Sequence, residues 1–297
     1  MSRDKLTSYG GQAVIEGVMM RGESAVAIAM RSPEHEIVLH TEPLNDIYKS
    51  KLIKIPFLRG IIALWDALVL GMRALTISAN LQGDEDEQIE GAALYLTLAF
   101  SLALSIGLFF LAPATAGHFI QDWLNIDNNW VTNLIEGLIR LAILVGYIWG
   151  VSRMEDIRRV FAYHGAEHKT INAVEAGVEL TPEEVAKQSV EHPRCGTAFL
   201  LTVVVFSILI FSLVGPIDSI WVKLGVRILL IPILATIAYE YVRWTARNIN
   251  NPIVRLLIRP NLALQHLTTK EPDLAMIEVA ITSFKAMQKM DEEYKVL

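Results

Sequence analysis

The stretch TAFLLTVVVFSILIFSLVG, residues 197–215, contains 19 residues and no charged side chain. An α-helix needs about 20 mostly apolar residues to cross the hydrocarbon core of a bilayer, which is roughly 30 Å thick. This segment therefore predicts a transmembrane helix. The chain as a whole is consistent with that prediction, because 53% of its 297 residues are hydrophobic and only 20% are charged. An ordinary soluble protein is less apolar.

Three further stretches have similar length and composition, so the sequence predicts four transmembrane helices. They cover residues 92–115, 131–151 and 219–242. The last two contain charged residues, which we expect to pair across the bundle or to extend to the interface. A polar path through the bundle, as in a transporter, is the alternative. These charged residues are Glu136, Arg140, Lys223 and Arg227.

Lysine and arginine are concentrated in alternate loops. Residues 1–91 contain nine, residues 152–196 contain six, and the tail from Arg243 onward contains eight, whereas residues 116–130 and 216–218 contain none. Basic residues accumulate on the cytoplasmic side of membrane proteins. We therefore expect a multi-pass protein of the cytoplasmic membrane, with both termini and the loop 152–196 in the cytoplasm.

A fifth apolar segment, residues 57–81, is long enough to cross the bilayer. Its polar residues recur every seven positions and therefore share one face of a helix: Arg59, Asp66, Arg73 and Asn80. Inserting this helix would also invert the distribution of basic loops. We predict an amphipathic helix in the cytoplasmic interface or against the bundle, with a re-entrant hairpin as the alternative.

The segment before this helix favours β-structure. Residues 24–44, SAVAIAMRSPEHEIVLHTEPL, alternate and are rich in Val and Ile, which predicts a β-hairpin. The preceding GGQAVIEGVMMRG, residues 10–22, contains glycines suited to tight turns. The expected fold is mainly α: a polytopic membrane protein with four transmembrane helices, a cytoplasmic interfacial helix and a small N-terminal β-hairpin element.

The expected organisation has five parts. They are an N-terminal β element with the amphipathic helix (1–91), transmembrane helices 1–2 (92–151), a cytoplasmic loop (152–196), transmembrane helices 3–4 (197–242) and a cytoplasmic helical tail (243–297). Within the tail we expect a helix that breaks at Pro260, then a second helix whose first turn is capped by Glu271 and Asp273.

Charge and cysteine content exclude some classes. A formal net charge of −6 argues against nucleic-acid binding. The single cysteine, Cys195, excludes an internal disulfide and gives no sign of an oxidising compartment. The N-terminal residues lack the apolar core of a secretory signal peptide.

The cytoplasmic loop contains a candidate metal site. Residues 154–175 predict a helix that Gly177 ends. On that helix His164 and His168 lie one turn apart and point the same way, so both can bind one ion. Glu167 completes the spelling H-x-x-E-H, in which the glutamate acts as the general base of inverzincin metalloproteases.

A second fragment of the loop, EHPRCG, adds His192 and Cys195. Between the fragments, TPEEVAKQ predicts a short helix that begins at Pro182 after Thr181. The loop could therefore fold both fragments together around a divalent metal, with zinc favoured by the ligand types. Four ligands would make a closed structural site, and three with a water would make a catalytic one. Simple packing is the alternative for Cys195.

Glu16 is a second candidate for the catalytic set. Its carboxylate stands within an apolar run, and burying it without a partner costs several kcal/mol. We expect residues 10–22 to pack over residues 163–196. Glu16 would then lie within reach of His164 and His168, or pair with an arginine such as Arg21 or Arg194.

Four motifs together resemble the YqhQ-like family of bacterial membrane proteins: GGQAVIEGVMMRG, HGAEHKTINA, HPRCGTAFL and LTTKEPDLAMIEVAI. The resemblance covers almost the whole chain. It implies a domain of unknown function tagged as a predicted metal-dependent enzyme, with no established substrate. The positions that it marks are Glu16, Arg21, His164, Glu167, His168, His192, Cys195, Glu271 and Glu278.

The function expected from these features is metal-assisted hydrolysis at the inner membrane surface, acting on a lipid headgroup or a membrane-associated peptide. One alternative is a non-enzymatic scaffold or assembly factor with a structural metal or none; a transporter is another. The expected partners are membrane lipids, and a membrane protein or a second copy of the chain.

Overall fold

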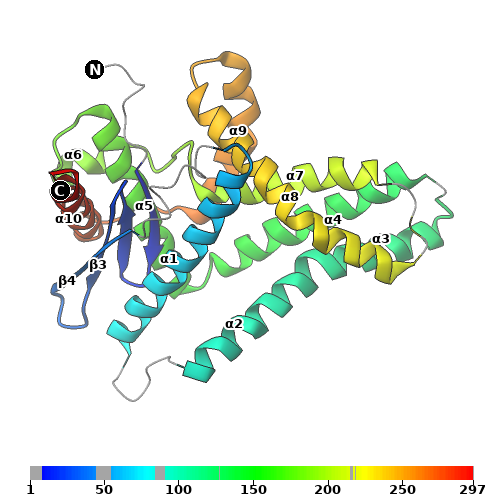
Figure 1. Ribbon diagram of the computed structural model, residues 1–297, viewed down its shortest axis with the longest axis horizontal. Coiled ribbons are helices and arrows are strands. Elements are labelled where there is room, and N and C mark those ends of the chain that lie inside the picture. The colour runs from blue at the N-terminus through cyan, green and yellow to red at the C-terminus, as the bar shows by residue number, and fades with distance from the viewer. Residues whose placement is uncertain are drawn as a thin grey trace.

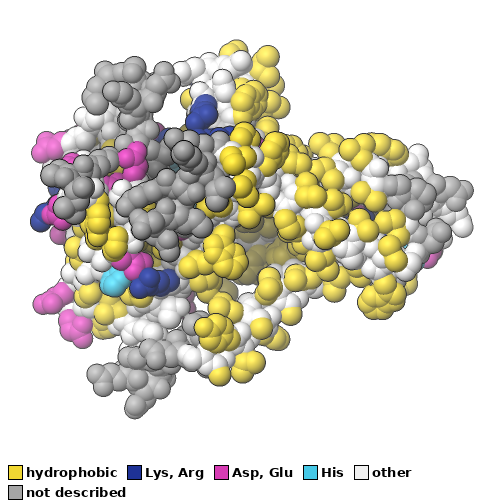
Figure 2. Space-filling model, viewed as in Figure 1, with side chains coloured by type: hydrophobic (Ala, Val, Ile, Leu, Met, Phe, Trp, Pro, Cys, Tyr) yellow, Lys and Arg dark blue, Asp and Glu magenta, His cyan; other side chains and the backbone are white. Residues whose placement is uncertain are grey.

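The computed structural model describes residues 9–44, 55–83, 91–126, 128–214, 217 and 219–296. It has two parts: a β-sheet covered by helices, and an elongated set of long helices that extends to one side (Figure 1). Charged side chains gather on the part that contains the sheet, while hydrophobic side chains cover the long helices (Figure 2). This distribution is compatible with a membrane protein.

The sheet has four antiparallel strands in the order β1-β2-β3-β4. The predicted hairpin is confirmed as β3 (Ala25–Arg31) and β4 (Ile37–Pro43). The glycine-rich segment adds a second hairpin, β1 (Gly10–Val14) and β2 (Gly17–Arg21), so the β element is larger than expected.

Helices cover both faces of the sheet. One face packs against α5 (Glu155–Ala176) and α10 (Leu274–Val296), and the other packs against the second half of α1 (Leu58–Gln82). Successive side chains of a strand point to opposite faces. Accordingly, Val18, Met20, Ala27 and Ala29 face α5 and α10, whereas Val14, Met19, Val26, Ile28 and Met30 face α1.

The long helices are α2 (Gly91–Ile106), α4 (Asn129–Val151), α7 (Gly196–Leu213) and α8 (Ile220–Arg247). A π-helical turn, η5 (Gly107–Leu111), continues α2 into α3 (Ala112–Trp123), so the first predicted span extends beyond its expected end at residue 115. With α1, five helices in the described residues are long and apolar enough to cross a membrane, by length and composition.

The polar stripe of α1 forms ion pairs with both parts of the molecule. Arg59 donates through Nε to Oε1 of Glu240 on α8 at 2.7 Å. Two further pairs, each 2.8 Å long, connect α1 to the sheet: Asp66 with Arg21, and Arg73 with Glu42. The seven-residue repeat therefore marks the side of α1 that is held by charged partners.

The charges within the bundle pair with one another, as predicted. Glu136 on α4 accepts a hydrogen bond from Arg140 at 2.8 Å and pairs with Arg227 of α8. Arg140 also donates to the carbonyl oxygen of Phe109 at 2.9 Å. Pro113 has no N–H to offer that carbonyl, so Arg140 supplies a donor. These contacts connect α4 to α8 and to η5.

The prediction of a break at Pro260 is wrong, because α9 (Pro252–Thr268) continues through it. The missing N–H of Pro260 leaves the carbonyl of Leu256 without a donor, but both residues lie on the exposed side of the helix. Buried Ile258 and Asn261 hold the two halves of α9 against the rest of the protein.

Candidate metal centre

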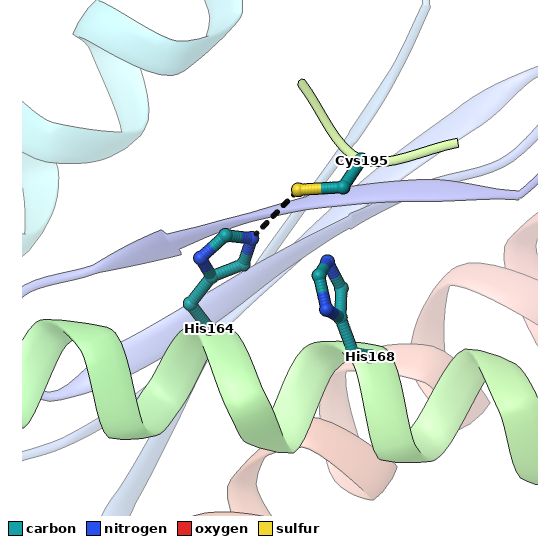
Figure 3. Close-up of side chains that lie close together, drawn as sticks. All are labelled: His164, His168 and Cys195. Atoms are coloured by element: carbon teal, nitrogen blue, oxygen red, sulfur yellow. Dashed lines mark hydrogen bonds between the residues drawn. The ribbon is translucent and has the colours of Figure 1, made fainter. Parts of the chain in front are cut away.

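Helix α5 carries both candidate histidines. It covers Glu155–Ala176 and ends at Gly177, whose φ of 69° is left-handed, so the predicted helix and its stop are confirmed. The rings of His164 and His168 lie one turn apart, with their centroids separated by 4.4 Å. Both side chains point from α5 toward Cys195 (Figure 3).

Cys195 approaches from the other fragment of the loop. It is the N-cap of α7, where its sulfur accepts a hydrogen bond from the backbone N–H of Thr197 at 3.4 Å. Its Sγ lies 3.2 Å from Nε2 of His164. One ligand atom from each of His164, His168 and Cys195 lies within 4.8 Å of the other two. The two fragments converge as expected and bring three of the four predicted ligands together, but His192 is not part of this group.

Backbone carbonyls orient both imidazoles. Nδ1 of His164 is 2.9 Å from the carbonyl oxygen of Thr268, and Nδ1 of His168 is 2.6 Å from that of Val190. A carbonyl oxygen only accepts, so each Nδ1 carries the proton and each Nε2 keeps a lone pair. Metal-binding histidines usually have this second hydrogen bond, which fixes the tautomer and the ring orientation.

His192 lies beside these three residues. Its ring centroid is 5.7 Å from that of His168, and its Nε2 is 3.6 Å from Oε1 of Glu175. This buried Nε2 has no hydrogen-bond partner among the described residues. Gln265 holds the His192 backbone from both sides, accepting from its N–H at 3.0 Å and donating to its carbonyl at 2.9 Å.

Glu167 is buried under the first strand of the sheet. A Cβ built on Gly11 of β1 would lie 2.7 Å from its Cγ, so only glycine allows the strand to pack this closely. Its Oε2 is buried without a hydrogen-bond partner in the described part of the chain. Burial raises the pKa of this carboxyl, against the opposing effect of His164 and His192.

Burial lowers the pKa of His168 and of His192. A lowered pKa keeps an imidazole neutral at pH 7, and the neutral form is the one that binds a metal ion. Burial therefore favours the ligand form of His168 and His192.

Glu16 forms a different cluster on α5. Residues 10–22 pack over this helix as expected. In the turn between β1 and β2, where φ of Glu16 is 51°, the carboxylate accepts two hydrogen bonds from Arg159, at 2.6 and 2.5 Å, and one from Tyr163 at 3.3 Å. The hydrogen bond from Arg159 holds the pKa of Glu16 below its usual value.

The prediction that an arginine pairs with Glu16 is confirmed, but the arginine is Arg159, and the suggested Arg21 and Arg194 were wrong. The hydrogen-bond partners of Glu16 among the described residues are Arg159 and Tyr163, and neither His164 nor His168 is one of them. Arg21 pairs with Asp66, and Arg194 pairs with Glu175 beside His192. Arg159 takes that role because it lies one turn before Tyr163 on the same face of α5, directly under the turn of the first hairpin. In the sequence, nothing distinguishes Arg159 from the other arginines near the end of the predicted span.

Two residues of α5 that were not predicted from the sequence, Lys169 and Gly165, help to hold the site in place. Lys169 is buried and donates to the carbonyl oxygens of Ala186 and Gln188, both at 2.7 Å, which fixes the loop after α6 (Pro182–Ala186). A Cβ on Gly165 would lie within 3.0 Å of the carbonyl oxygen of Lys270. Its absence lets the chain at the end of α9 approach His164.

Three acidic residues around the start of α10 lie at the edges of this region. Asp273 caps α10 as predicted, with Oδ1 accepting from the N–H of Met276 at 2.8 Å. Glu271 was also expected to cap α10, but its carboxylate pairs with Lys169 of α5 at 2.7 Å. Glu278 pairs with Arg31 of the sheet at 3.1 Å.

The fold and the cluster define a class: a mainly helical protein with apolar helices long enough to cross a membrane and a His–His–Cys cluster at the start of one of them. Residues 55–290 match the family described as "Protein of unknown function (DUF1385)". The chain belongs to this family. It is 36% identical over 307 aligned residues to "Uncharacterized protein YqhQ" of Bacillus subtilis (strain 168), covering 98% of this chain and 96% of the relative. No solved structure matches the chain.

Proposed function

We propose that the protein is a metal-dependent hydrolase of the cytoplasmic membrane. One observation carries the proposal: three donor atoms of His164, His168 and Cys195 lie within 4.8 Å of one another. On the same helix, Glu167 feels the electrostatic effect of His164, and its buried Oε2 has no hydrogen-bond partner among the described residues. A protein that needed these groups only for packing would gain nothing from a buried, unpaired carboxylate.

The donors suit zinc. Two imidazole nitrogens and one cysteine sulfur form a set that this ion accepts, and three protein ligands leave the fourth position open. The carbonyls of Thr268 and Val190 complete the outer shell. A bound ion of this kind would supply Lewis acidity and lower the pKa of a water molecule to about 7.

Glu167 is the general base in this proposal. Its raised pKa suits a carboxylate that accepts a proton from water at Oε2 and holds it during the reaction. His192 is close enough to lower the pKa of Glu167, and its buried Nε2 is free to exchange a proton. We assign it the transfer of that proton to the leaving group. Glu16 positions Arg159 and Tyr163 on the same helix.

The proposed topology has four spans, α2–α3, α4, α7 and α8, with α1 at the cytoplasmic surface. The position of α1 is supported by its packing on the sheet and by its ion pairs with Arg21 and Glu42. Irregular backbone and open sheet edges are not stable in contact with hydrocarbon. The substrate would be a lipid headgroup or a membrane-associated peptide that meets the site at the start of α7.

A second candidate is a closed structural zinc site in a non-enzymatic scaffold protein. It is favoured by the buried Nε2 of His192, which forms no hydrogen bond with the described residues and would become the fourth ligand. Glu167 would then have no chemical role. The charged residues within the bundle are engaged with one another, which supports a structural role for them rather than a transport path.

The two candidate functions predict different effects of Glu167→Gln and His192→Gln on the zinc content and on the reaction products. The purified full-length protein in lipid nanodiscs is incubated with a total bacterial lipid extract and, separately, with a membrane peptide extract; mass spectrometry then identifies new products. For an enzyme, Glu167→Gln keeps the zinc content and abolishes the products. Loss of zinc in His192→Gln, with identical products from wild type and Glu167→Gln, rejects the hydrolase and favours the structural site.

A further inference from the structure

Helix α9 has three distinct faces. One face is buried in the protein, and a second, basic and exposed, includes Arg255 and Arg259. The third is an exposed apolar stripe with the helical spacing i, i+3, i+4, i+7, i+10. Three large side chains of this stripe remain exposed: Ile253 by 67%, Leu256 by 61% and Leu257 by 47%. The rest of the stripe is Pro260 and Ala263.

The stretch of sequence that contains α9 is basic. Residues 241–270 contain five lysine and arginine residues and no aspartate or glutamate. They are Arg243, Arg247, Arg255, Arg259 and Lys270. An apolar stripe flanked by basic residues is typical of a helix that lies in the interface of an anionic membrane.

The position of α9 in the fold agrees with a location in the membrane interface. It leaves the end of α8 at a steep angle to α7 (Figure 1), and its hydrophobic side chains gather on the side toward the long apolar helices (Figure 2). Near its C-terminal end, Leu264 packs into a cluster with Leu144, Ile148, Leu201 and Val204 of α4 and α7. The N-terminal half projects away from these helices with its apolar stripe uncovered.

We infer that α9 lies in the inner membrane–water interface, with its apolar stripe among acyl chains and its arginines bound to anionic lipid headgroups. About 1.5 Å of rise per residue makes this 17-residue helix roughly 25 Å long. The lipid surface is the occupant that matches both stripes at once. A protein partner would match the apolar stripe but would not need the run of arginines.

This location has a consequence for the site, which rests on the proposed function. The end of α9 supplies the Thr268 carbonyl to His164 and the Gln265 side chain to His192. A helix anchored in the interface therefore holds the imidazole of His164 and the backbone of His192 at headgroup depth. The substrate class that fits is a phospholipid-type amphiphile whose reactive bond lies at the level of its headgroup.

The first experiment measures the environment of α9 in the full chain. Nitroxide labels are placed at Leu256→Cys and Arg259→Cys in a Cys195→Ala background, in nanodiscs of phosphatidylglycerol and phosphatidylcholine. We expect oxygen to relax the label at position 256 more strongly than a water-soluble nickel complex does, and the reverse at position 259. Equal exposure of both labels to nickel would overturn the inference. Protection of position 256 from both reagents would identify a protein partner and also overturn it.

The second experiment counts bound lipids by native mass spectrometry. The double variant Arg255→Gln/Arg259→Gln should retain several-fold less phosphatidylglycerol than wild type, whereas Lys285→Gln/Lys289→Gln on α10 should retain the wild-type amount. Equal loss in both would show unspecific charge attraction and reject the site on α9. Neither experiment requires a metal. If they succeed while no metal is found, the proposed hydrolase fails and the interfacial helix stands.

Discussion

The carbonyl oxygen of Thr268 lies 2.9 Å from Nδ1 of His164, so the last turn of α9 orients one of the three candidate ligands. The two residues are 104 positions apart in the chain. This contact depends on Gly165, because the chain after Thr268 passes directly over it and Lys270 donates its N–H to the carbonyl of Phe161 at 2.9 Å. The tail of the protein is therefore a structural part of the site.

The first prediction concerns that glycine. Gly165→Ala would place a methyl group within 3.0 Å of the Lys270 carbonyl and push the segment away from α5. Overpacking of this kind costs about 1–3 kcal/mol, and it would also displace Thr268 from His164. We expect a lower unfolding temperature together with at least a several-fold weaker affinity for zinc, measured by thermal unfolding and competition with a chelator.

Gly146→Ala on α4 is the matched control, since nothing lies within 4 Å of a Cβ at that position. Gly146→Ala should leave the unfolding temperature and the zinc affinity unchanged. Wild-type zinc affinity in Gly165→Ala would show that the end of α9 does not orient the site.

The second prediction concerns the unpaired carboxyl of Glu167. Burial raises its pKa, which means that the charged form is disfavoured in the folded protein. In metal-free protein, Glu167→Gln should therefore maintain or raise the unfolding temperature at pH 7. Glu175→Gln, which removes the partner of Arg194, should lower it. A strongly destabilised Glu167→Gln would indicate a structural role for this carboxylate.

The third prediction concerns acid stability. Arg159 holds the pKa of Glu16 below its usual value of about 4.5, so between the two values the folded state binds fewer protons than the unfolded state. The stabilisation is fully present above about pH 4.5 and is lost as the pH falls through the lowered value. We expect Glu16→Gln to lower the unfolding temperature at pH 7, with a difference from wild type that shrinks as the pH falls below about 4.5.

Glu292→Gln on the exposed side of α10 serves as the control for this titration and should follow wild type throughout. A difference between Glu16→Gln and wild type that stays constant with pH would mean that the ion pair with Arg159 contributes nothing to folding.

The fourth prediction concerns topology. In a Cys195→Ala background, a cysteine at Phe119, which is 68% exposed, should react with a membrane-impermeant reagent from outside the cell. Cysteines at Gly83 and Glu183 should react only after the membrane is opened. Reaction of Gly83→Cys from outside would mean that α1 crosses the membrane, and the assignment of the site to the cytoplasmic side would fail with it.

Helix positions could be predicted from the sequence because their signals are local. The predicted helix 154–175 differs by one residue at each end from α5, since its apolar spacing and Gly177 define it without reference to the rest of the chain. Asp273 was recognisable as a cap for the same reason.

The contacts that complete the site had no local signal. The hydrogen-bond partners of Nδ1 in His164 and His168 are backbone carbonyls, which every residue possesses. Arg159 could not be distinguished from its neighbours until the first hairpin was placed over α5. Pro260 misled the prediction because packing on both of its sides outweighs the loss of one backbone hydrogen bond.

The metal content of the full-length protein tests the central claim most directly. The protein is purified without chelators, alongside His168→Ala and the α10 control Glu292→Gln, and each is analysed by elemental mass spectrometry. We predict about one zinc-type ion per chain in wild type and in the control, and a content near zero in His168→Ala with the protein still inserted in the membrane. A content near zero in wild type, or an unchanged content in His168→Ala, would contradict the account.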